Sequence, residues 1–292
     1  MGVNLVLVIF WSLRKRWILF FPLVAVLLAF YSFGTLYEVG TPEDMKEKEG
    51  LRVMTFNTRG FSDSGFRKPN TYGNDIVAFV AREDPDVLCL QEFNPYRLKD
   101  FQQYPFYFLT PRGKGKSTQV IFSKYPIVGQ GEVFFPDSNN NTLYADIDYN
   151  GDTLRIYNVH LQSYQIRSRR ILWRNYGQDF LKRLYSVARK HRRQSELVRE
   201  HREASPYPSL ICGDFNATSF SRPYRILSKG LQDSFREKGS GWGATYYLNQ
   251  ILPYRIDHIL VPREFEILAH QNYDIRLSDH LPVMAILKPK GE

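Results

Sequence analysis

The sequence of 292 residues is poor in cysteine, with only Cys89 and Cys212, each inside an apolar run. Their spacing matches no zinc-binding motif, which excludes a structural zinc site of the usual kinds. We expect both to be small buried hydrophobic side chains, with a disulfide as the less favoured alternative. A Gly-x-Ser-x-Gly motif and a glycine-rich phosphate-binding loop are also lacking. A serine hydrolase of that type and a P-loop nucleotide-binding protein are therefore excluded.

Acidic residues are outnumbered, and the basic excess lies mostly in one segment. The formal net charge is +9. Residues Gln165–Glu203 hold twelve Lys and Arg against four Asp and Glu, a local charge of +8. The simplest interpretation is a solvated helix face whose Arg stems cover apolar surface. The alternative is contact with anionic lipid headgroups or with a polyanionic substrate.

The N-terminus contains a long run without charge. Trp17–Tyr37 comprises twenty-one uncharged residues, preceded by the basic triplet Arg14–Arg16 and the apolar piece Val3–Leu13. That length suffices for a helix to span a bilayer. We therefore predict one or two membrane segments in residues 1–37, with the main span at 17–37. A cleaved signal peptide is the rival interpretation.

The basic triplet also predicts an orientation. The positive-inside rule keeps Arg14–Arg16 in the cytoplasm, whether the anchor in the cytoplasmic membrane is single-pass or a hairpin. The rest of the chain would then lie on the extracytoplasmic side. Residues 38–50 are polar and lack periodicity, which predicts a linker. The folded domain is predicted to span residues 51–292.

Short strand patterns alternate with helical ones through this domain. Asn150–Gly151, between two alternating runs, predicts a type I′ hairpin. Such hairpins favour a mixed, mostly antiparallel sheet architecture with helices packed outside, rather than a doubly wound parallel sheet. Helices are predicted at 72–83, 165–203 and near 224–228, and strands at 51–57, 86–92, 117–122, 143–149, 153–160, 208–212, 255–260 and 281–287.

Acids, amides and imidazoles stand at the ends of six of these strands. Singly, each has a simple structural explanation: Asn57 caps a turn, or Asp214 and Asn216 close an Asx turn. Together they are an improbable way to stabilise a core, because such groups are costly to bury unpaired. Their clustering is what a metal-assisted hydrolytic site requires. The candidate residues are Asn57, Glu92, His160, Asp214, Asn216, Asp257, Asp279 and His280.

The residue types indicate the chemistry. Several carboxylates and an amide, with no thiolate, suit a hard cation such as Mg²⁺ or Mn²⁺. Two histidines and a further acid would transfer protons or stabilise charge around a phosphoryl group. Residue types alone therefore predict a metal-assisted hydrolase of phosphate esters.

The chain resembles the endonuclease/exonuclease/phosphatase superfamily, which includes deoxyribonuclease-like and sphingomyelinase-like members. Seven motifs carry the resemblance in the same order: Thr55–Asn57, Leu90–Glu92, Ser123–Ile127, Tyr157–Leu161, Gly213–Asn216, Arg255–Asp257 and Ser278–His280. The resemblance implies a four-layered α/β sandwich of two mixed, mostly antiparallel sheets with helices outside. It also implies a site at one rim of the sandwich.

The resemblance further implies a role for each candidate residue. Glu92 is expected to be the main metal ligand, with Asn57 and Asp279 at or near the metal. Asp257 is expected to hydrogen-bond to His280 and orient it. Family members differ over whether the acid matching Asp214 or the histidine matching His280 is the general base, and both stay open here. Asp214 and Asn216 are expected to position or activate the attacking water, and His160 to contact a phosphate oxygen.

The same resemblance leaves the substrate open. Phe56 precedes Asn57 and Thr58–Arg59 follow it, a departure from abasic-site endonucleases that argues against DNA repair. A lipid headgroup, a small phosphodiester and nucleic acid all fit, and the predicted anchor favours the first two over an extracytoplasmic nuclease. A non-catalytic binding protein that retains the fold is the contrasting hypothesis, and the presence of every candidate residue opposes it.

Overall fold

The computed structural model describes residues 2–14, 20–33, 37–40, 44–61, 72–111, 117–136, 138–164, 178–248 and 252–291. The chain divides into two compact units, Met1–Tyr37 and Glu38–Glu292. Glu38 is tied to the second unit by an antiparallel bridge to Gly241, with a 2.9 Å hydrogen bond in each direction. The predicted linker at 38–50 and domain at 51–292 stay predictions.

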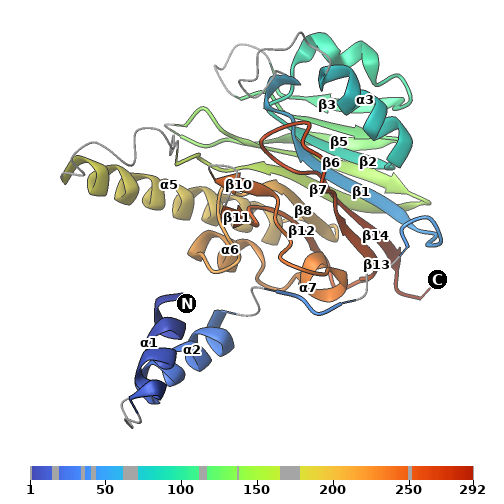
Figure 1. Cartoon of the computed structure of the whole chain (residues 1–292). Coiled ribbons are helices and arrows are strands. Elements are labelled where there is room, and N and C mark those ends of the chain that lie inside the picture. The colour runs from blue at the N-terminus through green and yellow to red at the C-terminus, as the bar shows by residue number, and fades with distance from the viewer. Residues whose placement is uncertain are drawn as a thin grey trace. The chain divides into compact units, whose positions relative to one another are not determined.

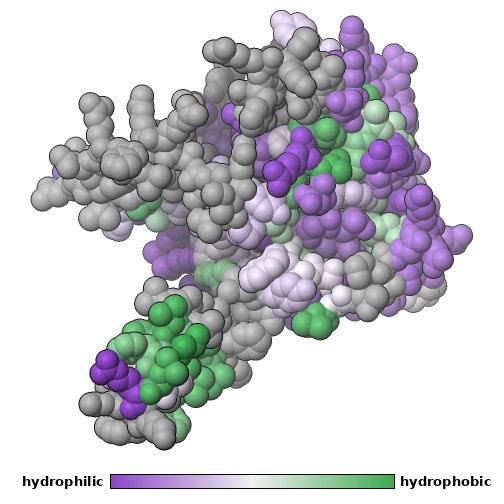
Figure 2. Space-filling view, viewed as in Figure 1, coloured by the Kyte–Doolittle hydropathy of each residue, from purple (hydrophilic) through white to green (hydrophobic). Residues whose placement is uncertain are grey.

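The first unit consists of two short apolar helices, α1 (Gly2–Leu13) and α2 (Phe20–Phe33). Large apolar side chains on both are exposed to solvent, among them Leu13 at 81% and Phe21 at 66%. Figure 2 shows apolar surface gathered on this unit.

The predicted membrane anchor is wrong. Among the residues that the structure describes, no helix is both long and apolar enough to cross a membrane. Residues 17–19 and 34–36 of the predicted span at 17–37 lie outside the described residues. This finding overturns the single-pass or hairpin anchor in the cytoplasmic membrane and the extracytoplasmic placement deduced from it.

Two six-stranded sheets form the centre of the second unit (Figure 1). Their strand orders are β13-β14-β1-β2-β4-β3 and β5-β6-β7-β8-β12-β9, and β10 and β11 form a separate ribbon. The strands are β1 (Leu51–Asn57), β2 (Val87–Gln91), β3 (Phe106–Leu109), β4 (Val120–Ser123), β5 (Ile127–Val133), β6 (Thr142–Tyr149), β7 (Asp152–His160), β8 (Ser209–Asp214), β9 (Gln232–Asp233), β10 (Tyr246–Leu248), β11 (Leu252–Tyr254), β12 (Asp257–Val261), β13 (Phe265–Asn272) and β14 (Val283–Pro289).

The pairing within the sheets is mixed and mostly antiparallel, which confirms that part of the predicted fold. In the described strands, β1 and β2 pair in parallel, as do β7 and β8, and the other pairs are antiparallel. The strands of a parallel pair end at the same edge of their sheet. Each sheet therefore carries a central parallel pair whose carboxyl ends point in one direction. Asn150–Gly151 joins β6 and β7 with positive φ at both residues, as a type I′ turn requires.

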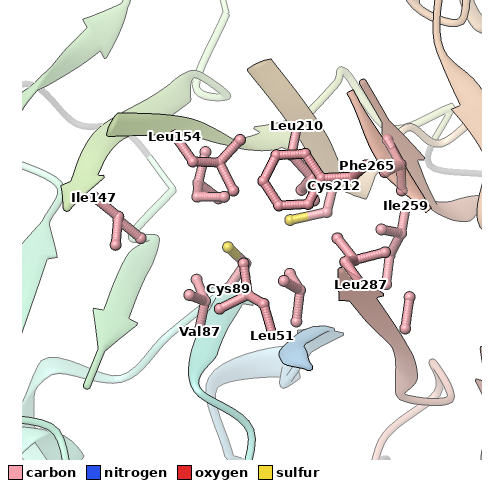
Figure 3. Packing of buried hydrophobic residues seen from close by; sticks show 14 of the residues in the cluster. Leu51, Val87, Cys89, Ile147, Leu154, Leu210, Cys212, Ile259, Phe265 and Leu287 are labelled. Carbon is pink, nitrogen blue, oxygen red and sulfur yellow. The ribbon is translucent and has the colours of Figure 1, made fainter. Parts of the chain in front are cut away.

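Apolar side chains from the facing sides of both sheets fill the space between them. Successive residues of a strand point to opposite faces. Leu51 and Val53 of β1 therefore pack in the layer between the sheets, where β2 and β8 contribute the two cysteines. Figure 3 shows the sulfurs of Cys89 and Cys212 pointing toward one another across this layer. Both thiols are free and fully buried, and burial raises the pKa of Cys89.

Helices cover the outer faces of the sheets and complete the sandwich. Ile76, Phe79 and Val80 of α3 (Tyr72–Glu83) pack in one cluster with Met54 and Phe56 on the outer face of the first sheet. On the second sheet, α5 (Gln178–Glu203) and α6 (Arg222–Leu227) contribute to the outer cluster with β7 and β8. The short α7 (Ser234–Lys238) packs against β13 and β12. The fold is a sandwich of two mixed sheets with helices outside.

Most predicted elements coincide with observed ones, but several strands were missed. The helix predicted at 72–83 is α3, and Gln178–Glu203 of the helix predicted over 165–203 is α5. Residues 165–177 lie outside the described residues. The missed β5 contains Gly129 and Gly131, and β13 has a register shift between Ile267 and Ala269 that interrupts the apolar alternation.

Two further histidines, His258 and His270, are buried in this fold. His258 lies beside the rings of Phe215 and Tyr224, and a ring nitrogen is 3.0 Å from the carbonyl oxygen of Ala217. Burial, followed by the charge of Arg255, lowers the pKa of His258 to about 3, against the opposing charge of Asp233. Burial likewise lowers the pKa of His270 to about 4. Both side chains are therefore neutral in the folded protein near neutral pH.

The pKa of His258 predicts a pH-dependent contribution to stability. In the unfolded chain the imidazole titrates near pH 6.5, so between about pH 6.5 and the folded pKa only the unfolded state gains the proton. The stability contributed by the neutral ring is therefore lost as pH falls through this window. His258→Gln should be less destabilising at about pH 5 than at about pH 7.5, by about 2 kcal/mol. Urea unfolding at both pH values measures this, and a constant difference would contradict it.

Candidate active site

The alternation of β-strands brings the predicted residues to one edge of the layer between the sheets. On β1, the face that carries Leu51 and Val53 continues to Asn57, and on β8 the face that carries Cys212 continues to Asp214. His160 and Asp257 lie directly beside Asp214 in the register of β7 and β12. One row across neighbouring strands therefore carries an imidazole and two carboxylates.

Asp214 is at the centre of the site. Its side chain is 1% exposed, and Asn57 and Asn216 donate hydrogen bonds to its Oδ2 at 3.0 and 3.2 Å. The Nε2 atoms of His160 and His280 each lie 3.7 Å from the same oxygen. Burial raises the pKa of Asp214 to about 6, although the charge of His280 opposes this.

The turn after β8 combines a structural and a site role. The Oδ1 atom of Asp214 accepts a hydrogen bond from the backbone N–H of Asn216 at 2.8 Å, which closes an Asx turn. Asn216 adopts a φ of 47° and donates from Nδ2 to the carbonyl oxygen of Leu161 at 3.0 Å. The structural alternative considered from the sequence is therefore present, and it holds the carboxylate in place.

His280 and Asp257 form a buried hydrogen-bonded pair. The Nδ1 atom of His280 lies 2.9 Å from Oδ2 of Asp257, which leaves Nε2 directed at Asp214. The backbone N–H groups of Ile256 and Asp257 both donate to Oγ1 of Thr245 at 3.0 Å. Burial lowers the pKa of His280, but the charges of Asp257 and Asp214 outweigh it and raise the pKa to about 10. His280 is therefore an imidazolium at neutral pH.

His160 has the opposite protonation tendency. Burial lowers its pKa, against the charge of Asp214, and the positive charge of His280 lowers it further. Its Nδ1 lies 3.4 Å from the hydroxyl of Ser117, and its Nε2 lies 4.0 Å from Oε1 of Glu92. The site thus holds one charged and one neutral imidazole on two sides of the same carboxylate.

Glu92 occupies an unusual turn immediately after β2. Its φ is 48°, in the left-handed region that non-glycine residues seldom adopt. The carbonyl oxygen of Glu92 accepts hydrogen bonds from Oγ1 of Thr58 and the backbone N–H of Gly60, at 3.1 and 2.7 Å. The side chain of Glu92 is 43% exposed, and its Oε1 lies 3.4 Å from Nδ2 of Asn57. The turn therefore directs a carboxylate to the open side of the site.

Oxygen donors for a hard cation line this open side. Glu92 and Asp279 both line a cavity of about 380 Å³ that also contains Asp214, Asn216 and His280. Carboxylate oxygens without a thiolate fit Mg²⁺ or Mn²⁺. A second group, Asp214, Asp257 and His280, has ligand atoms within 4.8 Å of one another. Because His280 is held as a protonated partner of Asp257, we assign this inner group to hydrogen bonding rather than to a cation.

The structure brings all eight predicted residues to this region by different contacts. Asp257 lies behind His280, and Asp279 forms an ion pair with Arg59 at 3.4 Å. The other six are joined by the hydrogen bonds and short distances around Asp214 and Glu92: Asn57, Glu92, His160, Asp214, Asn216 and His280.

A buried polar network behind this edge was missed by the sequence analysis. The Nε2 atom of Gln91 donates to Oγ1 of Thr55 and to Oδ1 of Asn158, at 2.9 and 2.7 Å. Asn158 in turn donates to the carbonyl oxygens of Leu90 and Val120. This network links the two sheets directly below the site. Its signal in the sequence was an uncharged polar residue within or next to each apolar strand motif.

Aromatic side chains of the cavity were also missed. Tyr164, Tyr246 and Tyr254 line it, and the ring of Tyr246 lies 5.1 Å from that of His280. Tyr246 and Tyr254 face each other across the β10–β11 ribbon. The segment Gly239–Tyr247 is rich in glycine and aromatic residues, which is the signal in the sequence that could have indicated this loop.

The fold is a sandwich of two mixed sheets, and acids, amides and imidazoles gather at one edge of it. These features indicate a class of phosphate-ester hydrolases. The model of the Endonuclease/Exonuclease/phosphatase family matches residues 54–280, which cover every candidate residue. The chain belongs to this family. It is 23% identical over 287 residues to a DNA-(apurinic or apyrimidinic site) endonuclease of Dictyostelium discoideum, a match that covers 84% of this chain and 73% of the relative.

Solved structures show the same fold. An endonuclease/exonuclease/phosphatase from Beutenbergia cavernae superposes with a TM-score of 0.64 at 19% identity, covering 84% of this chain and 72% of that chain. A mannosyl-6-phosphatase from Bacteroides thetaiotaomicron superposes with a TM-score of 0.59 at 20% identity, covering 82% of this chain and 99% of that chain. At these identities the similarity establishes the fold alone.

Gly213 precedes Asp214 on β8 and provides a test of how closely β8 approaches β7. Its φ is 132°, and a Cβ here would clash with the backbone oxygen and nitrogen of Val159 on β7. Gly213→Ala should therefore cost about 3 kcal/mol or more of unfolding free energy. Gly151→Ala is the matched control, because Gly151 also has positive φ but open space around it, and should cost about 1 kcal/mol. Denaturant unfolding measures both, and equal losses would contradict the close approach.

Proposed function

We propose that this protein is a divalent-metal-dependent hydrolase of phosphate esters in which an activated water attacks the phosphorus in line. The observation that carries the proposal is the set of groups around the buried carboxylate of Asp214. Two amides fix this carboxylate, and a charged and a neutral imidazole lie 3.7 Å from its Oδ2. Such an arrangement positions a proton acceptor beside groups that stabilise the charge of a phosphoryl oxygen.

Each residue has a role that follows from its contacts. Asp214 accepts the proton of the attacking water, and Asn216 keeps its carboxylate oriented through the Asx turn. Asp257 holds the ring of His280 through Nδ1, so that Nε2 faces the reacting group. His160 contacts a phosphate oxygen from the other side of Asp214. Because the raised pKa of His280 keeps its ring protonated at neutral pH, His280 cannot accept a further proton, and Asp214 is favoured as the proton acceptor.

Glu92 and Asp279 are the residues that would hold the cation, with Asn57 beside Glu92. A bound Mg²⁺ or Mn²⁺ supplies Lewis-acid polarisation of the phosphoryl group and neutralises its charge. Arg59 pairs with Asp279 at 3.4 Å in this structure. The Asp279 carboxylate therefore already lies beside a positive charge on the open side of the site.

The proposed function covers both phosphodiesters and phosphomonoesters as substrates. The relatives are named as a DNA endonuclease and a sugar phosphatase, so their names do not choose between these classes. The membrane argument that favoured a lipid headgroup no longer applies. A non-catalytic binding protein would not need the hydrogen-bonded pair of Asp257 and His280, which orients an imidazole toward a second buried acid.

Removal of divalent metal should abolish activity. We expect hydrolysis of bis-p-nitrophenyl phosphate with Mg²⁺ or Mn²⁺, loss of this activity in EDTA, and recovery when excess metal is restored, because the carboxylates of the site need a cation to bind an anionic ester. Release of p-nitrophenolate measures the rate. His280→Ala is the control for contaminating enzymes. Activity that survives both EDTA and this substitution would refute the proposed mechanism.

Asp257→Asn should lower the turnover number more than it changes substrate binding. The amide keeps the shape of the side chain but removes the charge that holds His280 as an imidazolium. We expect kcat to fall roughly a hundredfold or more with little change in KM, the size of effect typical for loss of a donor that stabilises charge in the transition state. Steady-state kinetics measure this, with circular dichroism to verify folding. A change confined to KM would contradict the orienting role of Asp257.

A further inference from the structure

A second cavity lies along one face of α5, which Figure 1 shows as a long helix beside the second sheet. Its volume is about 410 Å³, and its lining includes Tyr185, Arg189 and Arg193, spaced by four residues, together with Lys190 and Gln194. Residues four apart lie on the same face of a helix. None of the described residues that line the cavity is acidic. Its charge therefore suits an anionic ligand.

Gln194 provides a donor that lacks a partner in the described part of the protein. Its side chain is 3% exposed, and its Oε1 accepts a hydrogen bond from the backbone N–H of Gln162 at 3.0 Å. This bond fixes the orientation of the amide. The Nε2 atom is buried and has no hydrogen-bond partner among the described residues. An unsatisfied buried donor is costly, and an oxygen atom of a ligand in the cavity would satisfy it.

Tyr185 adds an aromatic surface next to these cations. It is 67% exposed, and the guanidinium of Arg189 lies 5.9 Å from the centre of its ring. A large aromatic side chain gains little from such exposure in the free protein. Positive groups that follow a backbone, with an exposed aromatic ring on which a base can stack, are the recurring features of surfaces that bind single-stranded nucleic acid.

Two contacts connect α5 to the segment that lines the active-site cavity. Ser163 and Tyr164 line the active-site cavity, and the preceding residue, Gln162, is the hydrogen-bond partner of Gln194 in the second cavity. The ring of Tyr164 also packs edge-on against that of His191 of α5, at 4.8 Å. The segment 162–164 therefore contacts α5 at Gln194 and His191 and also contributes to the lining of the active-site cavity.

We propose that α5 binds the backbone of a single-stranded nucleic acid, one phosphodiester of which lies in the active site. Arg189, Lys190 and Arg193 contact phosphates, Nε2 of Gln194 donates to a phosphate oxygen, and a base stacks on Tyr185. This inference rests on the proposed hydrolase function and names the substrate class for it.

The test compares a double variant with a control of equal charge on the same helix. Arg189→Gln with Arg193→Gln removes two charges from the cavity. Arg192→Gln with Arg199→Gln removes two charges that form ion pairs with Glu196 and Glu203 instead. Both charge changes are equal, so a general electrostatic effect would appear in both variants. Surface ion pairs of this kind contribute little to stability.

Binding of a fluorescein-labelled oligothymidylate is measured by anisotropy in EDTA, so that turnover plays no part. The cavity variant should bind about tenfold more weakly than the control variant. The slope of log K against log salt concentration should decrease by about 1.4, at about 0.7 for each lost phosphate contact to a single strand. Equal affinities and slopes in the two variants would overturn the proposal. An equal loss for a blunt duplex of the same length would overturn the assignment to a single strand.

A kinetic comparison distinguishes this inference from the proposed function. The ratio of kcat/KM for the oligonucleotide to that for bis-p-nitrophenyl phosphate should fall about tenfold in the cavity variant, because the small ester is too short to reach α5. If the unmodified protein hydrolysed neither the oligonucleotide nor bis-p-nitrophenyl phosphate, the proposed function would be refuted. Hydrolysis of both with an unchanged ratio would overturn the role of α5 alone.

Discussion

The site depends on one geometrical constraint, which is that alternate residues of a strand face the same side. In a sandwich of two sheets, this side is the layer between them. The apolar part of this layer contains Val53, Cys89 and Cys212. Toward one edge of the layer, Cys89 of β2 is followed on the same face by Gln91, and Cys212 of β8 by Asp214. The core and the active site are therefore two ends of the same rows of side chains. A shift of one residue in register would move a row from the inner to the outer face.

This arrangement buries charge, and the structure compensates for it locally. Asp214 and Asp257 are each 1% exposed, which would be strongly unfavourable for isolated carboxylates. His280 lies between them, 2.9 Å from one and 3.7 Å from the other, and its positive charge partly neutralises the pair. The amides of Asn57 and Asn216 satisfy the Asp214 oxygen that both imidazoles face. The same contacts that make burial tolerable also fix the directions of the reacting groups.

The sequence predicted the features that depend on local pattern and failed where distant segments meet. Strand alternation located Asn57 and Asp214, and the Asn150–Gly151 turn was evident from its residue types. The contact of Gln91 with Asn158 could not be predicted, because it joins different sheets. The membrane anchor was wrong because hydropathy reports only the length of an apolar run, whereas none of the described helices is both long and apolar enough to cross a membrane.

Loss of the anchor changes which observations bear on the substrate. Tethering had favoured a lipid or small ester, and the basic segment was most simply a solvated helix face. In the structure, Arg192 and Arg199 conform to that simple explanation, since each pairs with a glutamate one turn away. Arg189 and Arg193 instead line a cavity with a buried, unsatisfied amide donor of Gln194. The arginines of α5 therefore include some that pair with glutamates and others that line a cavity, and only the latter have surroundings that a solvated helix would not need.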